Sequence, residues 1–475
     1  MARDRLPFTL KLYRGSTRFA APFAGMLLKR RLKRDKEDPK RVAERRGIAS
    51  KRRPRGPLVW VHGASVGEIL SVMPLLERIR ASGVAILLTS GTVTAARLAQ
   101  RRLPEGVLHQ FSPLDSPAFV HRFLDYWRPG LVLLAESELW PNMITQAANR
   151  GIPLVMINGR LSKRSFDRWK LFGRTASALL SNIDLCLAQE TEDARRLAQL
   201  GAARVFTTGN LKFDVPPPPA DPMALSALKR ATRGRTIVLA ASTHQGEETM
   251  IIEAHRRLRR TVPDLLTIIA PRHPERGRAV VGEAEEAGLL AVLRTRAHLP
   301  DSGIEIYVAD TIGELGLFYR LAPIVFVGGS LVKHGGQNPI EPAKLDCAIL
   351  HGPHVSNFSM IYAELNRARG AATVTDVDSL TTSIERLLYD PNLASQMAEA
   401  AHTTVLRLGG ALERTFAAIN SPSRTATRSV NVPPTSVPRK LSLLFMLRAL
   451  ANSGRMPTPV TSVIRVEDRE TAWRK

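Results

Sequence analysis

The segment HGASVGE, residues 62–68, places a carboxylate directly behind a short apolar run. The run Leu58–His62 has the composition of a buried strand, and a helix-like pattern follows the segment. Gly63 and Gly67 permit a tight turn, but their spacing matches neither the dinucleotide-binding fingerprint nor the P-loop. Glu68 therefore has two interpretations. It is a general base that takes a proton from a hydroxyl nucleophile, or a carboxylate that only stabilises the first turn of its helix.

Two later segments carry further candidates for acid–base chemistry or substrate contact. AESELWPN brings Glu136 and Glu138 to the end of another apolar run. Paired carboxylates there can transfer a proton or accept hydrogen bonds from sugar hydroxyls, although a solvated loop around a packed tryptophan has the same pattern. TGNLKFD contains Lys212, which either reaches into a cleft between domains or lies on the surface.

Three segments in the second half of the chain combine glycine, proline and charged residues as anion-binding loops do. APRHPER holds Arg272 between two prolines, and arginine suits forked recognition of phosphate. ADTIGEL places Gly313 where a helix is expected to begin, and free N–H groups at helix starts bind phosphate or carboxylate. FVGGSLVKHGGQNPIEPA is rich in glycine and contains Glu341, which can accept from two ribose hydroxyls. Together the three segments predict a nucleotide pocket.

No metal site is expected. The 11 histidines include no H-E-x-x-H motif, and no cysteine–histidine cluster is present. Asp376 and Asp378 form a D-x-D triplet, but this triplet is frequent by chance and follows a strand far from the glycine-rich loop. Cys186 and Cys347 lie in apolar runs, so we expect reduced, buried thiols in a cytosolic compartment.

Short apolar segments alternate with longer amphipathic segments from residue 58 onward, which is typical of parallel βαβ units. The strands predicted in the first half are Leu58–His62, Val84–Ser90, Leu131–Ala135, Leu154–Asn158, Leu185–Gln189 and Val205–Thr208. A run of four prolines, residues 216–219, predicts a stiff linker. The strands predicted after it are Thr236–Ala241, Leu266–Ala270, Ile306–Val308, Ile324–Val327, Ala348–Leu350 and Ala372–Thr375. The predicted fold class is therefore α/β, with two successive doubly wound domains that bind ligands beyond their strand ends.

The net charge of +25 is concentrated at the two ends. Residues 1–55 hold 19 Lys/Arg against 5 Asp/Glu, and residues 421–475 hold 10 against 3. Basic ends bind nucleic acid or hold a protein at an anionic membrane surface. The uncharged run Phe19–Leu28 has ten residues, half of the roughly 20 that a spanning helix needs.

An interfacial amphipathic helix with a basic flank is therefore favoured for the N-terminal segment. No aromatic stacking platform accompanies the basic runs, which argues against nucleic acid. A basic extension without a specific partner is the remaining alternative. The apolar run Leu441–Ala451 is predicted to be a second surface-binding helix or a partner-binding segment.

In their order along the chain, the motifs HGASVGE, LLAESELWPN, TGNLKFD, APRHPER and GGSLVKHGGQNPIEPA resemble those of the 3-deoxy-D-manno-octulosonic acid (Kdo) transferases of lipopolysaccharide synthesis. The resemblance covers roughly residues 35–420. It implies a metal-independent, inverting GT-B glycosyltransferase, with two Rossmann-like domains facing an interdomain cleft and no cofactor. It also implies CMP-Kdo as donor, a lipid A precursor such as lipid IV(A) as acceptor, and the cytoplasmic face of the inner membrane as location.

By this resemblance, Glu68 matches the catalytic base of the family, and Glu138 and Lys212 match positions that stabilise the transition state. The residues that match the CMP-binding segments are Pro271, Arg272, Gly313, Glu314, Leu315, Asn338, Pro339, Ile340 and Glu341. The chain departs from the family pattern at both ends. Family members commonly begin with a longer apolar anchor, and the basic C-terminal tail is not typical of them.

Five regions are predicted. They are a basic amphipathic membrane-associating segment (1–55), an acceptor domain (56–214), a proline-rich linker (215–235), a CMP-sugar-binding domain (236–420) and a basic tail expected to be disordered (421–475). Two alternatives remain. One is a GT-B glycosyltransferase that uses a UDP-sugar and another acceptor. The other is a basic nucleic-acid-binding factor with a nucleotide-responsive body, whose binding would fall steeply with salt.

Overall fold

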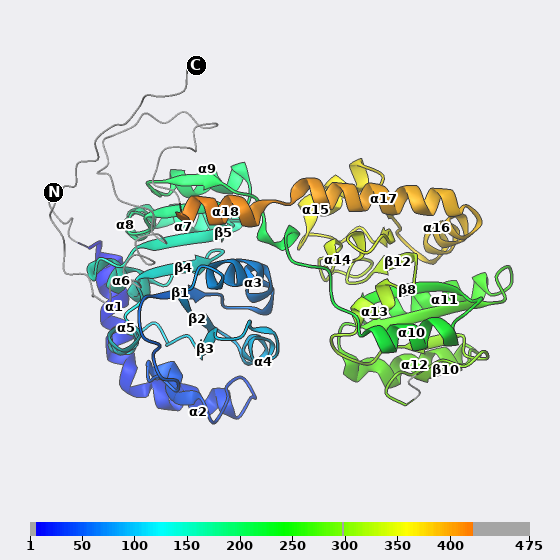
Figure 1. Cartoon of the computed structure of the whole chain (residues 1–475), viewed down its shortest axis with the longest axis horizontal. Helices are drawn as coiled ribbons and strands as arrows, with labels where there is room; N and C mark the ends of the chain where they lie inside the picture. Colours follow the sequence, from blue (N-terminus) through cyan, green and yellow to red (C-terminus); the bar gives the residue numbers. More distant parts are fainter. Residues whose placement is uncertain (1–5, 297–298, 421–475) are drawn as a thin grey trace, which may run out of the picture. The chain divides into compact units, whose positions relative to one another are not determined.

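The computed structural model describes residues 6–296 and 299–420, which form two α/β units (Figure 1). The first unit comprises the described residues up to Asn210 together with the segment from Leu412, and the second comprises Leu211–Ala411. Each unit is built around a seven-stranded sheet whose strand pairs are all parallel. The predicted fold class of two doubly wound α/β domains is confirmed.

The first sheet has the strand order β3-β2-β1-β4-β5-β6-β7. Its strands are β1 (Leu58–His62), β2 (Ala85–Ser90), β3 (Leu108–Phe111), β4 (Leu131–Ala135), β5 (Leu154–Gly159), β6 (Leu185–Ala188) and β7 (Val205–Thr207). The helices that follow them are α3 (Val66–Arg80), α4 (Val93–Arg102), α5 (Pro117–Trp127), α6 (Pro141–Asn149), α7 (Lys163–Leu171), α8 (Gly173–Leu180) and α9 (Thr191–Gln199). Every residue of β1 and β4 is buried, as expected for strands covered on both faces. The chain order reverses between β1 and β4, and such a switch point is where doubly wound sheets bind ligands.

The second sheet repeats this arrangement in the order β10-β11-β9-β8-β12-β13-β14. Its strands are β8 (Thr236–Thr243), β9 (Leu265–Pro271), β10 (Ala291–Leu293), β11 (Ile306–Val308), β12 (Ile324–Val327), β13 (Ala348–His351) and β14 (Ala371–Thr373). Its helices are α10 (Pro222–Ala231), α11 (Glu247–Leu258), α12 (Gly277–Glu286), α13 (Leu315–Tyr319), α14 (Ile340–Ala343), α15 (Ser359–Arg367), α16 (Val377–Tyr389) and α17 (Pro391–Leu408). The switch point lies between β8 and β12, so the strand ends that matter for binding are those of β9, β8 and β12.

The chain passes from the first unit to the second after Asn210 and returns after Ala411, whereas the predicted domain boundaries lie after residues 214 and 420. The region predicted as a linker contains α10, which Asp221 caps and which buries Leu228 in the core of the second unit. At the other end, α18 (Ala411–Asn420) belongs almost wholly to the first unit. There Arg414 Nε donates to the Thr208 carbonyl at 2.8 Å, and the Arg78 guanidinium lies 4.6 Å from the Phe416 ring centre.

The N-terminal segment is part of the first unit rather than a free extension. It forms α1 (Phe8–Ala20) and α2 (Ala24–Leu32), and α1 lies against α5 and α6 (Figure 1). Leu10 is buried in the main core, and Tyr13 Oη donates to Asp115 at 3.1 Å. Among the described residues, no helix has the length and apolar character needed to cross a membrane. The tail 421–475, with its apolar run Leu441–Ala451, lies outside the described residues.

Candidate active site

Glu68 lies in the first turn of α3, directly beyond the carboxyl end of β1. Ser65 caps this helix, and its hydroxyl also donates to Glu68 Oε1 at 2.8 Å. The Ala64 N–H donates to Glu68 Oε2 at 2.8 Å. The loop thus holds both carboxylate oxygens in place, and the side chain is 9% exposed. This geometry fits the helix-stabilising interpretation and the base interpretation equally, because a capping carboxylate is also an oriented one.

The protein environment raises the pKa of Glu68 above its ordinary value. Burial raises the pKa of the carboxyl, and the nearby charges of Glu138 and Glu136 raise it further. The hydrogen bonds from Ser65 and Ala64 act in the opposite direction but do not reverse the shift. A general base works best when its pKa lies close to the working pH, so the direction of this shift suits that role.

Glu138 follows β4, the neighbour of β1, and lies opposite His62 at the end of β1. Its Oε2 lies 3.6 Å from His62 Nε2, and the Trp140 indole N–H donates to the same oxygen. The Thr89 hydroxyl accepts from the Trp60 indole at 2.8 Å and lies 2.9 Å from His62 Nδ1. Thr89 can therefore give its own proton to Nδ1, which leaves the imidazole proton on Nε2, facing Glu138.

The two carboxylates at this switch point have pKa values shifted in opposite directions. Burial raises the pKa of Glu138, but the hydrogen bonds from His62 and Trp140 lower it by more, so the net shift is downward. The structure thus pairs an ionised carboxylate with one that takes up a proton more readily. Such a divergence between neighbouring acids is how enzymes divide acid–base and electrostatic roles.

Glu136, in the same loop after β4, has an unusual backbone conformation. Its φ is +55°, a left-handed backbone conformation that residues other than glycine rarely adopt. The conformation is held by a hydrogen bond from the Glu136 N–H to the Ile157 carbonyl at 2.9 Å. Strained backbone of this kind concentrates at functional sites. It turns the chain sharply at the end of β4, before Glu138.

The nine donor-site candidates all belong to the second unit and follow three strands of its sheet. Pro271 and Arg272 come at the end of β9, the Gly313 segment follows β11, and the Asn338 segment follows β12. The strand order places β11, β9, β8 and β12 side by side, so these segments share one edge of the sheet. Arg272 is exposed there, and its backbone N–H donates to the Thr243 carbonyl at the end of β8.

Two of these segments are organised by their own acidic residues. The Glu314 carboxylate accepts hydrogen bonds from Arg294 Nε and Nη2, at 2.7 Å each. This pairing raises the pKa of Arg294. Glu341 accepts from the Asn338 amide at 3.3 Å, and the Asn338 side-chain oxygen accepts from the Ile340 N–H at 3.1 Å. Glu314 therefore shapes the Gly313 turn, whose φ is +90°, through its salt bridge with Arg294.

Sequence reasoning missed Glu247, the buried centre of this edge. Its carboxylate accepts from four backbone N–H groups: His244 at 2.9 Å, Gly329 at 2.7 Å, and Ser330 and Leu331 at 2.9 Å each. The side chain is fully buried. It ties the loop after β8 to the glycine-rich loop after β12, across the switch point. In the sequence it is one of two adjacent glutamates at a helix start, and nothing there distinguishes it from a surface residue.

The remaining candidates have other positions. Lys212 lies half-buried in a short 3-10 helix, Leu211–Phe213, that belongs to the second unit and not to the predicted acceptor domain. Asp376 caps α16 in a capping box, and Asp378 pairs with Arg257. Within residues 6–296 and 299–420, no group of three or more His, Cys, Asp or Glu side chains could hold a metal ion.

The prediction that both cysteines are buried and unpaired is confirmed, whereas the cytosolic compartment stays a prediction. Cys186 and Cys347 are free and buried, and burial raises the pKa of each thiol to about 12. Neither thiol is a nucleophile at neutral pH.

Comparison with known proteins relates the chain to one family. A family model described as 3-deoxy-D-manno-octulosonic-acid transferase (kdotransferase) matches residues 40–215. The 3-deoxy-D-manno-octulosonic acid transferase of Haemophilus influenzae is 34% identical over 383 residues, which cover 79% of this chain and 89% of that protein.

Two solved structures are also similar. The C-terminal CMP-Kdo binding domain of WaaA from Acinetobacter baumannii is 30% identical with a TM-score of 0.37, covering 38% of this chain and 96% of that domain. A glycosyltransferase from Rickettsia africae is 13% identical with a TM-score of 0.52, covering 76% of this chain and 97% of that one.

Proposed function

The chain belongs to the 3-deoxy-D-manno-octulosonic acid (Kdo) transferase family of glycosyltransferases, and from that premise we propose its reaction. It transfers Kdo from CMP-Kdo to a lipid A precursor such as lipid IV(A) in lipopolysaccharide biosynthesis, with inversion at the anomeric carbon. The observation that carries the proposal is the pair Glu68 and Glu138, held at the switch point of the first sheet with pKa shifts of opposite sign.

In the proposed reaction, an acceptor hydroxyl attacks the anomeric carbon of Kdo as the bond to the phosphate oxygen breaks. The hydroxyl proton passes to Glu68, because a sugar hydroxyl is a poor nucleophile until its proton is removed. CMP leaves with the bonding electrons. The ionised Glu138 stabilises positive charge that develops on the sugar ring, and the resemblance to the family assigns Lys212 to transition-state stabilisation as well.

The second unit is proposed to bind the donor. Arg272, exposed at the end of β9, pairs with the phosphate and offsets the charge that CMP gains on leaving. The Gly313 segment and the Asn338–Glu341 segment bind the remainder of the nucleotide at the same edge of the sheet. We propose that no divalent metal takes part, because Arg272 supplies the positive charge that a metal would otherwise provide.

The alternative reaction uses a UDP-sugar as donor. Purified protein should release CMP from CMP-Kdo in the presence of a lipid A precursor, at the same rate with and without EDTA. Release of UDP from UDP-sugars, with none of CMP from CMP-Kdo, would replace the proposed donor with the alternative.

Arg272→Ala should weaken CMP-Kdo binding by about 10- to 100-fold, since a charge-assisted hydrogen bond contributes roughly 1.5–3 kcal/mol. Arg272→Lys should restore only part of the affinity, because an ammonium cannot make the forked contact. The measurement is calorimetric titration with CMP. Arg278→Ala, an exposed arginine at the start of α12, serves as the matched control. Equal CMP affinity in the Arg272→Ala variant and the parent would remove Arg272 from the phosphate site.

We further propose that α1 and α2 hold the protein on an anionic membrane, at the cytoplasmic face of the inner membrane. These helices bury Leu10 and Leu28, but large apolar side chains on them and on the 3-10 turn between them (Ala21–Phe23) are exposed: Phe19 at 79%, Phe23 at 58% and Met26 at 72%. Lys29, Arg30 and Arg31 follow in the last turn of α2. Exposed apolar side chains beside basic ones are what an interfacial helix presents to an anionic bilayer. A surface-bound enzyme would meet its amphiphilic acceptor in the plane of the membrane.

The triple substitution of Phe19, Phe23 and Met26 to serine should lower affinity for anionic phospholipid vesicles by at least about 10-fold. Each buried apolar side chain contributes on the order of 1.5–3 kcal/mol when fully buried, and interfacial insertion is partial. Substitution is preferable to deletion, because removing α1 would expose the core around Leu10. The control replaces the exposed Met223 of the second unit with serine. Unchanged vesicle sedimentation of the triple variant would reject this surface.

A further inference from the structure

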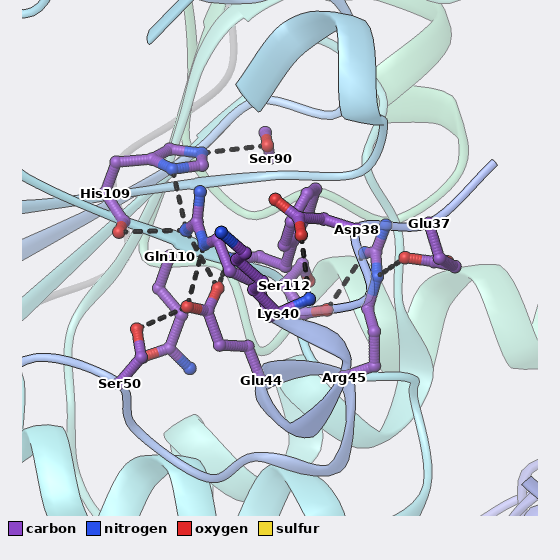
Figure 2. Close-up of polar contacts among 12 residues, drawn as sticks. Glu37, Asp38, Lys40, Glu44, Arg45, Ser50, Ser90, His109, Gln110 and Ser112 are labelled. Carbon is purple, nitrogen blue, oxygen red and sulfur yellow. Dashed lines mark hydrogen bonds and ion pairs between the residues drawn. The ribbon is translucent and has the colours of Figure 1, made fainter. Parts of the chain in front are cut away.

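A buried cluster of charged residues fastens the segment after α2 to the first sheet (Figure 2). Glu37, Glu44 and Arg45 are at most 4% exposed. Glu44 accepts a forked pair of hydrogen bonds from Arg41, at 3.0 and 2.9 Å, and also accepts from the Phe111 N–H at the end of β3. Burying so many charges is costly unless each is paired, so a hydrophobic contact would be a simpler way to attach this segment. The cluster therefore calls for a role besides attachment.

Arg45 is the residue of the cluster that reaches the loops at the carboxyl edge of the sheet. Its Nε donates to Glu37 at 2.9 Å and its Nη1 to the Ser112 carbonyl at 3.1 Å (Figure 2). Its Nη2 donates to the Gly91 carbonyl at 2.6 Å. The guanidinium also stacks on Phe111, 4.5 Å from the ring centre. All three nitrogens are thus committed. Two of them hold the residues that directly follow β2 and β3.

A second set of contacts holds Ser90, the residue before Gly91, and runs from Arg41 through His109. Arg41 Nη2 lies 3.0 Å from His109 Nδ1. His109 Nε2 in turn lies 2.9 Å from the Ser90 hydroxyl (Figure 2). Burial lowers the pKa of His109 to about 3, so the imidazole is neutral. Since Nδ1 accepts from Arg41, the proton is on Nε2 and is donated to Ser90. Ser90 and Gly91 are both fixed from the same segment.

Gly91 in turn contacts the loop that carries Glu68. Its N–H donates to the Ala64 carbonyl at 3.1 Å, and the Ala64 N–H donates to Glu68 Oε2 at 2.8 Å. The two backbones are so close that a Cβ on Gly91 would lie 3.1 Å from the Ala64 carbonyl oxygen and 3.3 Å from its Cα. Three consecutive hydrogen bonds therefore connect Arg45 with the carboxylate of Glu68.

We propose that Arg45 is a positioning residue for the catalytic base: through Gly91 and Ala64 it sets the orientation and the proton affinity of Glu68. This inference rests on the proposed role of Glu68. It gives the buried charge cluster a purpose, because a guanidinium fork fixes two carbonyls at defined positions, which a non-polar side chain cannot do. A displacement of about 1 Å at a catalytic group can reduce the rate about 100-fold.

Arg45→Lys tests the proposal without changing the net charge. A single ammonium cannot hold Glu37 and both carbonyls, so the Ala64 loop should loosen. We expect kcat for Kdo transfer to fall about 10- to 100-fold, with little change in KM for CMP-Kdo. Weaker donation from Ala64 removes a contact that favours the ionised form of Glu68. Its pKa should rise, and the acidic limb of the pH–rate profile should move to higher pH.

That shift separates positioning from mere stability, because partial unfolding would lower the rate equally at every pH. The other ionisable groups around Glu68 are Glu136 and Glu138 after β4 and His62 at the end of β1, and the substitution alters none of them. Arg53→Lys is the matched control. Arg53 lies in the same unit and also donates to backbone carbonyls, those of Trp127 and Gly56, but these precede β4 and β1 at the opposite edge of the sheet.

Gly91→Ala supplies an independent test if Arg45→Lys fails to fold. The added methyl group presses on Ala64 without touching any ion pair, and should move the acidic limb in the same direction. Folding is checked by thermal unfolding, and Glu68→Gln is assayed alongside. Wild-type rates and an unmoved acidic limb in both folded variants would overturn the role of Arg45, as would an equal shift in Arg53→Lys. Full activity of Glu68→Gln would instead overturn the base assignment itself.

Discussion

Glu68→Gln is expected to reduce Kdo transfer by at least about 10²-fold and up to about 10⁴-fold, the range that general-base catalysis supplies. Glutamine keeps the size of the side chain, and its oxygen can still accept from Ala64 or Ser65, but it cannot take the acceptor proton. CMP binding should be unchanged, because the donor residues belong to the second unit. The rate is measured with saturating CMP-Kdo and lipid A precursor, on protein whose fold has been checked by thermal unfolding.

The competing interpretation makes a different prediction for the same variant. If Glu68 only stabilises the start of α3, its replacement should cost about 0.3–1 kcal/mol of unfolding free energy and leave the rate almost intact. Glu77→Gln, an exposed position on the same helix, controls for the loss of one negative charge. A Glu68→Gln protein that transfers Kdo as fast as Glu77→Gln would end the catalytic interpretation.

Glu247→Ala should lower the unfolding free energy of the second unit by about 3–5 kcal/mol. Removing the carboxylate leaves four backbone N–H groups without their acceptor in a buried site, and each unsatisfied donor costs on the order of 1–3 kcal/mol before relaxation. For a unit of this size the loss corresponds to a decrease in melting temperature of about 10 °C. Calorimetry on the full chain measures it.

The same variant should also weaken CMP binding, because Glu247 holds the glycine-rich loop that precedes Asn338. Glu253→Gln is the matched control on the same helix. Glu253 pairs with Arg256 and Arg257 at the surface, where such pairs contribute about 0–1 kcal/mol. Melting of Glu247→Ala at the temperature of Glu253→Gln would contradict a structural role for the buried carboxylate.

Most of the sheet architecture was predictable because buried parallel strands are short and uniformly apolar. The strands Leu58–His62, Leu131–Ala135, Ile306–Val308 and Ile324–Val327 were predicted with the bounds that the structure shows. Two strands were missed. β3 has the sequence LHQF. Its polar residues His109 and Gln110 are buried because hydrogen bonds satisfy them, so the strand lacks an apolar pattern. β10 is a three-residue strand at the edge of its sheet, and only its last residue, Leu293, is buried.

The site residues that directly follow predicted strands could be identified from the sequence. Those whose role depends on contacts with residues distant in the sequence could not. Glu68 and Glu138 follow strands β1 and β4, and the sheet order makes them neighbours. The buried roles of Glu44, Arg45 and Glu247 depend on partners 46 to 84 positions away in the sequence. A basic segment such as residues 31–50 has the composition of a solvated surface. Only its contacts show that its charged side chains are buried and hold the residues at the ends of β2 and β3. The return of α18 to the first unit is a long-range contact of the same kind.

The most direct test of the account is the mass of the lipid product. Purified full-length protein is incubated with CMP-Kdo and a tetra-acylated lipid A precursor, and the lipid fraction is examined by mass spectrometry. The account predicts a precursor that has gained one or more Kdo residues, with a matching amount of CMP released, and a rate of formation at least about 100-fold lower with the Glu68→Gln variant. A precursor of unchanged mass after incubation with folded, CMP-binding protein would contradict it.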